Sequence, residues 1–73
     1  MSELDARNLL CPMPVIRTQS AVNKSQTGDK LTVYCTDPGT VHDIPTWCRI
    51  NGHKVLEQKE HDGEIIFVIE VGG

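Results

Sequence analysis

Turn-forming residues recur along the chain at short intervals, and this spacing limits the possible fold more than any other feature. The turn signals are Gly28-Asp29, Asp37-Pro38-Gly39, Asn51-Gly52 and Asp62-Gly63. Each segment between them has room for only one or two short elements. A chain of 73 residues buries only about 60% of its unfolded surface, so we expect a single domain, residues 1–73, with a thin core.

Strand and helix patterns alternate between these turns. The alternation of Leu31, Val33 and Cys35 with polar and aromatic residues predicts a strand with one buried face. Asp62-Gly63 predicts a hairpin turn between the last two strands. The expected order is β-α-β-α-β-β, with strands at residues 3–7, 31–36, 55–60 and 64–71 and helices at residues 12 to about 26 and 38–50.

The second expected helix contains a proline. Asp37 is expected to be its N-cap, and Pro38 to occupy its first helical position. Pro45 cannot donate a hydrogen bond to the carbonyl of Val41, so we expect it to kink or split this helix. The apolar side of the helix consists of Val41, Ile44, Trp47 and Cys48.

Charge and composition argue against several functions. The chain has 7 basic and 10 acidic residues and a net charge of -3, which argues against direct nucleic-acid binding because such binding depends on neutralising phosphates. No apolar run is long enough to cross a membrane, and the acidic N-terminus lacks the apolar stretch of a signal peptide. We therefore expect a cytoplasmic protein that binds neither nucleic acid nor membranes.

The three cysteines, Cys11, Cys35 and Cys48, cannot all pair within one chain. They form no C-x-x-C motif, and the histidines are scattered as well, so the pattern does not favour a structural zinc site. We expect free thiols, no metal and no cofactor. Cys48 is expected in the core. For Cys35 two interpretations remain open, a buried spectator thiol and a resolving cysteine close to Cys11.

The expected topology brings Cys11 and Asp37 to the same edge of the sheet. A strand, a crossover helix and a second strand in one sheet normally run parallel. Both strands then end at one edge, where open α/β sheets bind their ligands. Cys11 follows the first strand and Asp37 follows the second. Asp37 and Asp43 are either a cap and a solvated side chain or parts of an acidic docking patch.

Cys11 directly precedes the first helix, whose first turn contains Pro12 and Pro14. Proline suits this turn because its missing N–H would be unpaired there anyway. We expect the prolines to hold Cys11 rigidly at a helix N-terminus, where the helix dipole stabilises a thiolate and modestly lowers the thiol pKa. Asp5 would oppose this shift if it points toward the sulfur. The alternative is a buried, unreactive cysteine.

Three blocks of sequence resemble the TusA/SirA-like family of small sulfur-carrier proteins. LDARNLLCPMPVIR (residues 4–17) resembles the signature LDxxGLxCPxPV, TDPGTVHDIPTWC (36–48) resembles the second motif, and GHKVLEQKEHDGEIIFVIE (52–70) resembles the closing hairpin. The resemblance implies an α+β fold, a two-layer α/β sandwich with two helices packed on one face of a four-stranded mixed sheet. Asn8 stands where many members have Gly, and we expect the fold to tolerate it because Asn adopts a left-handed conformation more readily than most residues.

The resemblance also implies a function. Family members accept sulfane sulfur as a persulfide on the cysteine of the CPxP motif, here Cys11, from a cysteine desulfurase or a rhodanese. They pass it to an acceptor protein in tRNA thiolation, molybdenum-cofactor synthesis or dissimilatory sulfur oxidation. Such a protein is a sulfurtransferase-type persulfide carrier rather than a stand-alone catalyst. Residues expected to dock partners or to support the site are Pro12, Met13, Pro14, Arg17 and Asp37.

Two other functional hypotheses remain open. The chain ends in Gly72-Gly73, and ubiquitin-like carriers hold sulfur as a thiocarboxylate on such a tail, although they begin with a hairpin rather than with a strand and a helix. The other hypothesis is a protein-interaction or regulatory module that never carries sulfur. His42 and His53 are versatile by type, but nothing in the sequence places either beside Cys11, so we interpret both as surface or structural residues.

Overall fold

The computed structural model describes residues 2–72 and contains the expected elements in the expected order. The strands are β1 (Ser2–Ala6), β2 (Lys30–Cys35), β3 (Lys54–His61) and β4 (Glu64–Glu70), and the helices are α1 (Met13–Asn23) and α2 (Thr40–Ile50). These bounds agree with the sequence-based ranges to within a few residues at each end. Within residues 2–72, neither helix has the length and apolarity needed to cross a bilayer.

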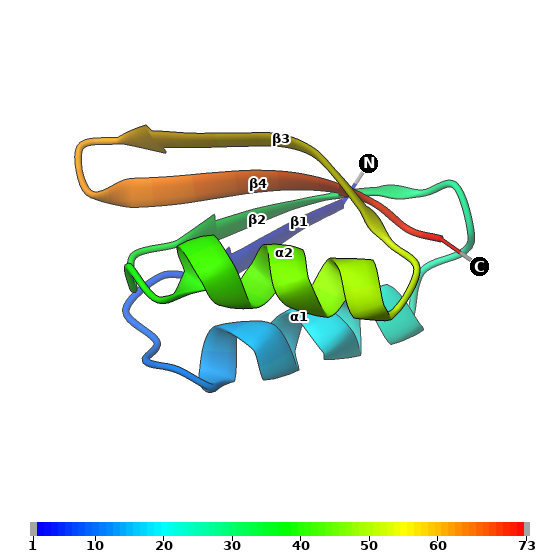
Figure 1. Cartoon of the computed structure of the whole chain (residues 1–73), viewed down its shortest axis with the longest axis horizontal. Coiled ribbons are helices and arrows are strands. Elements are labelled where there is room, and N and C mark those ends of the chain that lie inside the picture. The colour runs from blue at the N-terminus through cyan, green and yellow to red at the C-terminus, as the bar shows by residue number, and fades with distance from the viewer. Residues whose placement is uncertain (1, 73) are drawn as a thin grey trace.

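The four strands form one mixed sheet in the order β1-β2-β4-β3, and both helices pack on the same face of it (Figure 1). β1 and β2 run parallel, whereas β4 is antiparallel to both of its neighbours. The architecture is therefore the expected two-layer α/β sandwich. Because β1 and β2 end at the same edge, the segments that lead from them into α1 and α2 begin side by side.

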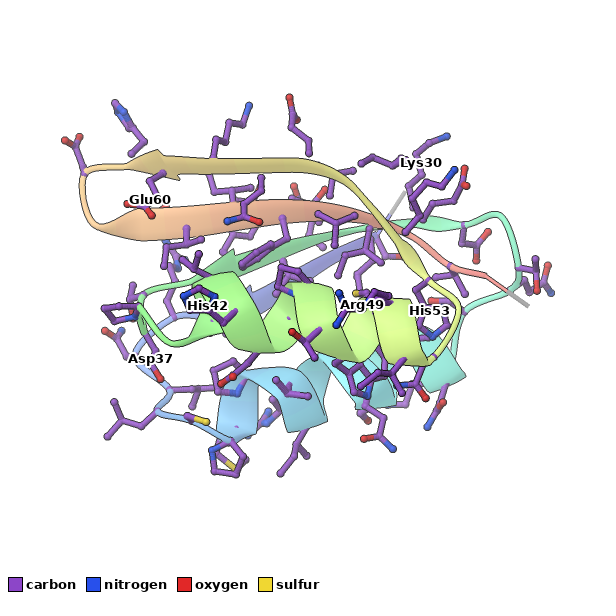
Figure 2. All side chains as sticks on the ribbon, in the orientation of Figure 1. Lys30, Asp37, His42, Arg49, His53 and Glu60 are labelled. Carbon is purple, nitrogen blue, oxygen red and sulfur yellow. The ribbon has the colours of Figure 1, made fainter. Side chains whose placement is uncertain are left out.

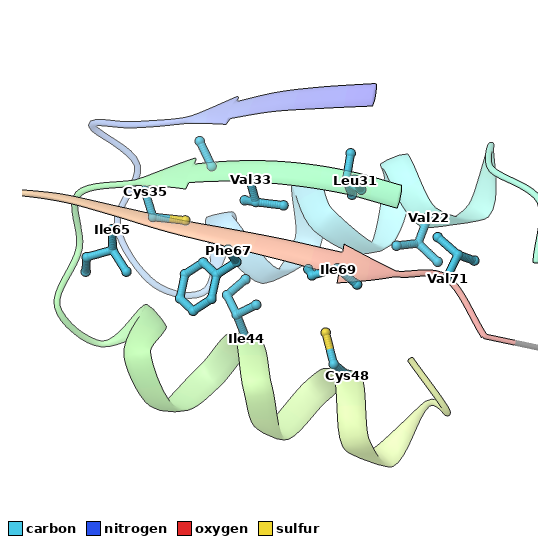
Figure 3. Close-up of a cluster of buried hydrophobic side chains, with 11 residues drawn as sticks. Val22, Leu31, Val33, Cys35, Ile44, Cys48, Ile65, Phe67, Ile69 and Val71 are labelled. Atoms are coloured by element: carbon cyan, nitrogen blue, oxygen red, sulfur yellow. The ribbon is translucent and has the colours of Figure 1, made fainter. Parts of the chain in front are cut away.

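The core lies between the sheet and the helices, and the alternation of side chains along β2 and β4 supplies most of it. In the β2–β4 ladder, Leu31, Val33 and Cys35 lie opposite Ile69, Phe67 and Ile65. All six are buried, and α2 closes this layer with Ile44 and Cys48 (Figure 3). The core is thin, as expected, and it fixes the side of α2 that faces the sheet.

Residues with positive φ lie at three of the expected turns and at Asn8. Asn8 has a φ of 65°, which confirms that it adopts the left-handed conformation. Its N–H donates a hydrogen bond to Thr36 Oγ1 at 2.8 Å, which ties the segment after β1 to the segment after β2. Asp62 and Gly63 have φ values of 50° and 81°, the pair of positive angles that a type I′ hairpin turn requires.

Of the two outcomes expected from the sequence at Pro45, a kink or a split of the helix, the split is wrong, because α2 is continuous through this residue. α2 is one helix from Thr40 to Ile50 with Pro45 inside it. The proline still cannot donate to the carbonyl of Val41. Ile44 before it and Cys48 after it are almost fully buried against the sheet. Packing on both sides of the proline therefore holds the helix in one piece.

α2 begins two residues later than expected, at Thr40 with Gly39 as its cap. Asp37 and Pro38 were expected as the N-cap and the first helical residue, and they form a turn before the helix instead. Asp37 Oδ1 accepts a hydrogen bond from the N–H of Gly39 at 3.1 Å, and its carbonyl accepts one from the N–H of Thr40 at 3.0 Å. The second carboxylate oxygen of Asp37 remains available to another partner.

α1 begins at Met13, with Pro12 as its cap residue rather than its first helical residue. The peptide bond between Cys11 and Pro12 is cis. The helix ends at Asn23, earlier than the expected end near Gln26. The N–H groups of the next two residues bond to carbonyls three residues back, and such contacts form a tight final turn that ends an α-helix.

Candidate functional site

Cys11 is exposed in the segment between β1 and α1, at the sheet edge where β1 and β2 both end. Its backbone N–H donates a hydrogen bond to Asp37 Oδ2 at 2.9 Å. The convergence of Cys11 and Asp37 expected from the topology is therefore confirmed by a direct contact. Figure 2 shows Asp37 beside the beginning of α2 and His42 in the first turn of that helix.

The thiol of Cys11 contacts a second carboxylate, that of Asp43. Sγ lies 3.1 Å from Asp43 Oδ2, so the S–H group donates a hydrogen bond to it. Sequence reasoning considered Asp43 only as a solvated side chain or as part of a docking patch, and it missed this contact. One signal was present: Asp43 is an acidic residue in the first turn of α2, and the parallel topology brings that turn to the edge that carries Cys11.

The pKa of the Cys11 thiol is raised above its ordinary value, so the expected lowering was wrong. The hydrogen bond to Asp43 is the largest cause, and loss of water and the negative charges of Asp43 and Asp37 act in the same direction. Asp5 does not take part. It is hydrogen-bonded and ion-paired to Arg7, with Oδ1 and Nε 2.9 Å apart, which lowers the pKa of Asp5 to about 2.

The N-terminus of α1 does little to offset these carboxylates, because it has few free N–H groups. Pro12 and Pro14 have none. The N–H of Met13 bonds to the carbonyl of Leu10 at 2.9 Å. The positive end of a helix dipole consists of the unpaired N–H groups of the first turn. The same prolines that make this segment rigid therefore remove donors that would stabilise a thiolate.

A groove of about 380 Å³ begins at Cys11 and lies between the start of α1 and one side of α2. Its lining residues are Cys11, Pro12, Val15, His42, Asp43, Thr46, Trp47 and Ile50. The chemically active groups gather at one end, where Asp43 meets the thiol, and Trp47 and Ile50 make the far end apolar. His42 shares this groove with Cys11, a proximity that the sequence did not indicate.

The segment around the thiol carries apolar side chains. Its exposed members are Leu10, Pro12 and Met13, and Arg17 is exposed one turn further along α1. Leu10 is 76% exposed and Met13 is 36% exposed, so both are accessible to a partner. Pro14 is buried, and its carbonyl accepts a hydrogen bond from Thr18 Oγ1 at 2.8 Å. Of the two roles expected for Pro14, docking is excluded and support of the first turn remains.

The other two cysteines lie in the core, as expected (Figure 3). Cys35 is 0% exposed and Cys48 is 1% exposed, and burial raises the pKa of each thiol to about 11. The sulfur of Cys48 points from α2 toward the sheet. Their burial favours the spectator interpretation of Cys35 over a resolving role. Cys11 is therefore the one exposed thiol of the three.

His53 is a structural residue, as expected. Its Nδ1 accepts a hydrogen bond from the N–H of Gly72 at 2.9 Å, and its ring centroid lies 5.1 Å from that of Trp47. These contacts hold the chain after β4 against the connection between α2 and β3. Gly73, the residue that a C-terminal thiocarboxylate would require, lies outside the described residues.

Comparisons with known proteins match almost the whole chain. The family model described as Sulfurtransferase TusA matches residues 2–71. The sulfur carrier protein TusA of Pseudomonas putida is 41% identical over 66 residues, which are 90% of this chain and 82% of that protein. The sulfur carrier protein TusA of Allochromatium vinosum is 38% identical over 68 residues, 93% of this chain and 90% of that protein. A SirA-like protein from Desulfitobacterium hafniense, 28% identical, matches with a TM-score of 0.86 over 100% of both chains. The chain therefore belongs to the TusA family of sulfurtransferases.

Proposed function

We propose that this protein is a sulfur carrier, which holds sulfane sulfur as a persulfide on Cys11 and relays it between two other proteins. The observation that carries the proposal is the contrast among the thiols, since Cys11 is exposed at a groove whereas Cys35 and Cys48 are buried. Family membership, with relatives named sulfur carrier proteins, supports the same role. The carried group is covalent, so we expect no cofactor.

Loading follows the chemistry of thiol–disulfide exchange. The thiolate of Cys11 attacks the outer sulfur of a donor persulfide, a new S–S bond forms at Cys11, and the S–S bond of the donor breaks. The donor sulfur leaves with the electron pair and takes up a proton, so the step needs no oxidant. Delivery repeats the same exchange, with an acceptor thiolate attacking the outer sulfur on Cys11. Both steps require that a second protein can reach this sulfur.

The partners follow from these two steps. The donor is a cysteine desulfurase or a rhodanese, and the acceptor is a protein of tRNA thiolation, molybdenum-cofactor synthesis or dissimilatory sulfur oxidation in the cytoplasm. The exposed side chains of Leu10 and Met13 supply apolar contacts beside the thiol, and Arg17 supplies a positive charge. An apolar contact surface beside the reacting atom suits a protein that meets more than one partner, and methionine adapts well to such surfaces.

The test is sulfur loading followed by mass spectrometry. Wild-type protein, Cys11→Ser and Cys48→Ser are each incubated with inorganic polysulfide, a small-molecule donor of sulfane sulfur, and their peptides are then mapped. We expect the wild type and Cys48→Ser to gain about 32 Da per sulfur on the peptide that contains Cys11, because an accessible thiolate is the reactive form. Cys11→Ser should gain none. Circular dichroism verifies that both variants remain folded.

Each alternative outcome points to one competing function. Sulfur bound at the C-terminal glycine would indicate a thiocarboxylate carrier. The absence of sulfur from every peptide of the wild type would indicate an interaction module that carries no sulfur. Loading of Cys11→Ser at the wild-type level would place the carrier group elsewhere and would contradict the proposal.

A further inference from the structure

We propose that Asp43 is a positioning residue, which keeps the unloaded Cys11 thiol protonated and fixed in one direction, so that the empty carrier reacts slowly. The inference rests on the proposed carrier function and assigns a role to a residue that the resemblance did not single out. It is carried by the contact between Cys11 Sγ and Asp43 Oδ2, which are 3.1 Å apart.

Both partners of this contact are held by hydrogen bonds of their backbone N–H groups. The N–H of Asp43 bonds to the carbonyl of Gly39 at 3.1 Å, and the next residue, Ile44, is fully buried. The N–H of Cys11 is bonded to Asp37 Oδ2 at 2.9 Å. Among residues 2–72, the hydrogen bond recorded for the Asp43 side chain is the one from Cys11 Sγ. Its carboxylate is therefore directed at the thiol and is not needed to cap α2.

Two negative charges lie near the thiol, and within residues 2–72 no salt bridge offsets them. A methyl group placed on Gly39 would lie 3.6 Å from Asp37 Oδ1 and 3.8 Å from Asp43 Oδ2, so the two carboxylates flank the same point. None of the salt bridges within residues 2–72 includes either carboxylate. On α2, His42 lines the same groove, and on α1 the nearest charged residue in sequence is the exposed Arg17. A thiolate here would be a third negative charge, which favours the S–H form.

Loading with sulfur removes this restraint. An S–S bond is about 2.05 Å long, so an outer sulfur has no room between Sγ and an oxygen 3.1 Å away. The outer sulfur must point into the groove or into solvent, and the hydrogen bond to Asp43 is lost. The proton that leaves Sγ during loading is balanced by the proton that the departing donor thiolate takes up. The loaded carrier therefore presents its sulfur without the contact that restrains the empty one.

The expected benefit is protection of the empty carrier. Thiolates, rather than thiols, react with disulfides, electrophiles and oxidants. A carrier that circulates with its only exposed thiol protonated avoids such reactions until it meets a sulfur donor. This role differs from that of a general base, which would speed the reactions of the thiol. The two roles predict opposite effects when the carboxylate is removed.

The experiment measures the rate of alkylation of Cys11 by iodoacetamide as a function of pH, with the site verified by peptide mass. Asp43→Asn removes the charge, Asp43→Glu retains a carboxylate, and Asp62→Asn is the matched control in the β3–β4 turn. For Asp43→Asn we expect the midpoint of the curve of alkylation rate against pH to fall by about one pH unit, as for loss of a nearby like charge. Thiolate then becomes about tenfold more abundant at neutral pH. Its nucleophilicity falls with its pKa, so alkylation should be about threefold faster.

The controls separate positioning from structure. Asp43→Glu should keep most of the raised midpoint, and Asp62→Asn should behave as the wild type. Added salt, from ~0.05 to ~1 M, should lower the wild-type midpoint more than that of Asp43→Asn, because salt screens exposed charges. An Asp43→Asn midpoint that is unchanged or higher, or slower alkylation, would overturn the proposal. Alkylation needs no sulfur donor, so the role of Asp43 is tested independently of sulfur loading. A wild type that never loads sulfur would refute the carrier function alone.

Discussion

Two grooves border α2, and the comparison between them shows where thiol chemistry can occur. One groove, of about 380 Å³, runs along α2 from His42 to Ile50, and Cys11 is exposed beside two carboxylates at its beginning. The other groove, of about 510 Å³, begins at Pro45 and is bordered by Arg49, His53 and Lys54. Figure 2 labels Arg49 and His53. This larger groove includes Cys48 in its lining, yet Cys48 is only 1% exposed.

The difference lies in the part of the fold that carries each cysteine. Cys48 is four residues after Ile44, so both lie on the side of α2 that faces the sheet. Its sulfur is part of the core, and the groove passes over it. Cys11 is not on α2 at all, but on a loop whose position is set by the parallel strands. The volume of a groove therefore does not indicate where thiol chemistry occurs in this protein. The accessibility of the sulfur atom indicates it.

The largest expected effect is on thiol accessibility under native conditions. Wild-type protein should show one fast thiol with a chromogenic disulfide and three after unfolding. Cys48 and Cys35 react only when the protein opens, so they should be slower by at least about 10³-fold for a stability near 5 kcal/mol. Cys11→Ser should show no fast thiol, whereas Cys48→Ser should keep it. A second fast thiol in the wild type would contradict the contrast between the two grooves.

The second effect compares the two sides of α2 through one type of substitution. Ile44→Ala removes a fully buried side chain and should lower the free energy of unfolding by about 2–5 kcal/mol. Ile50→Ala, whose side chain is 73% exposed in the groove that contains Cys11, should change it by less than about 0.5 kcal/mol. Urea titrations measure both. A large loss for Ile50→Ala would show that this groove is part of the core rather than an open surface.

Topology is the part of the site that the sequence predicts well. The strand–helix–strand order requires parallel β1 and β2, and that alone brings Cys11 and Asp37 to one edge. The alternation of Leu31, Val33 and Cys35 predicts a buried Cys35, and the core confirms it. These features depend on chain connectivity and on the period of the side chains, and both are visible in one sequence.

Contacts between separate elements are the part that the sequence does not reveal. The bond from Cys11 Sγ to Asp43 depends on how α2 is rotated about its axis relative to the start of α1. The raised pKa of the Cys11 thiol depends mainly on this contact, and therefore could not be predicted from the chain alone. The continuity of α2 through Pro45 is likewise not visible in the local sequence, because packing of the helix against the sheet outweighs the missing hydrogen bond.

The third expected effect concerns the contribution of Cys48 to the pH dependence of the free energy of unfolding. The folded-state pKa of Cys48 is about 11, whereas an ordinary thiol titrates near about 8.5. Between these values the unfolded chain releases the proton and the folded chain keeps it. The free energy of unfolding should therefore fall as pH rises, by up to about 1.4 kcal/mol per pH unit from this residue.

The Cys48→Ala variant isolates this contribution. Cys35, whose pKa is also raised to about 11, titrates in both proteins and therefore cancels in the comparison. The variant should show a flatter decline of stability from about pH 8.5 to 11, although its stability at neutral pH is lower because of the small cavity. Urea titrations at several pH values measure the slopes. Parallel slopes for the two proteins would mean that the Cys48 thiol is not protected by burial.

The smallest expected effect tests whether the surface around Cys11 meets partners. Met13→Glu places a charge on a side chain that is 36% exposed, and Leu56→Glu is the matched control on β3, where Leu56 is 44% exposed. Met13→Glu should slow transfer from a persulfide-loaded rhodanese or cysteine desulfurase, whichever loads the wild type faster. We expect a loss of about 1 kcal/mol, roughly fivefold in the rate of transfer, as for a contact outside the centre of an interface.

Loading by inorganic polysulfide should be less affected, because that donor makes no protein contact. Leu56→Glu should leave both rates unchanged. If Met13→Glu slows both donors equally, Met13 acts on the thiol itself and not on docking.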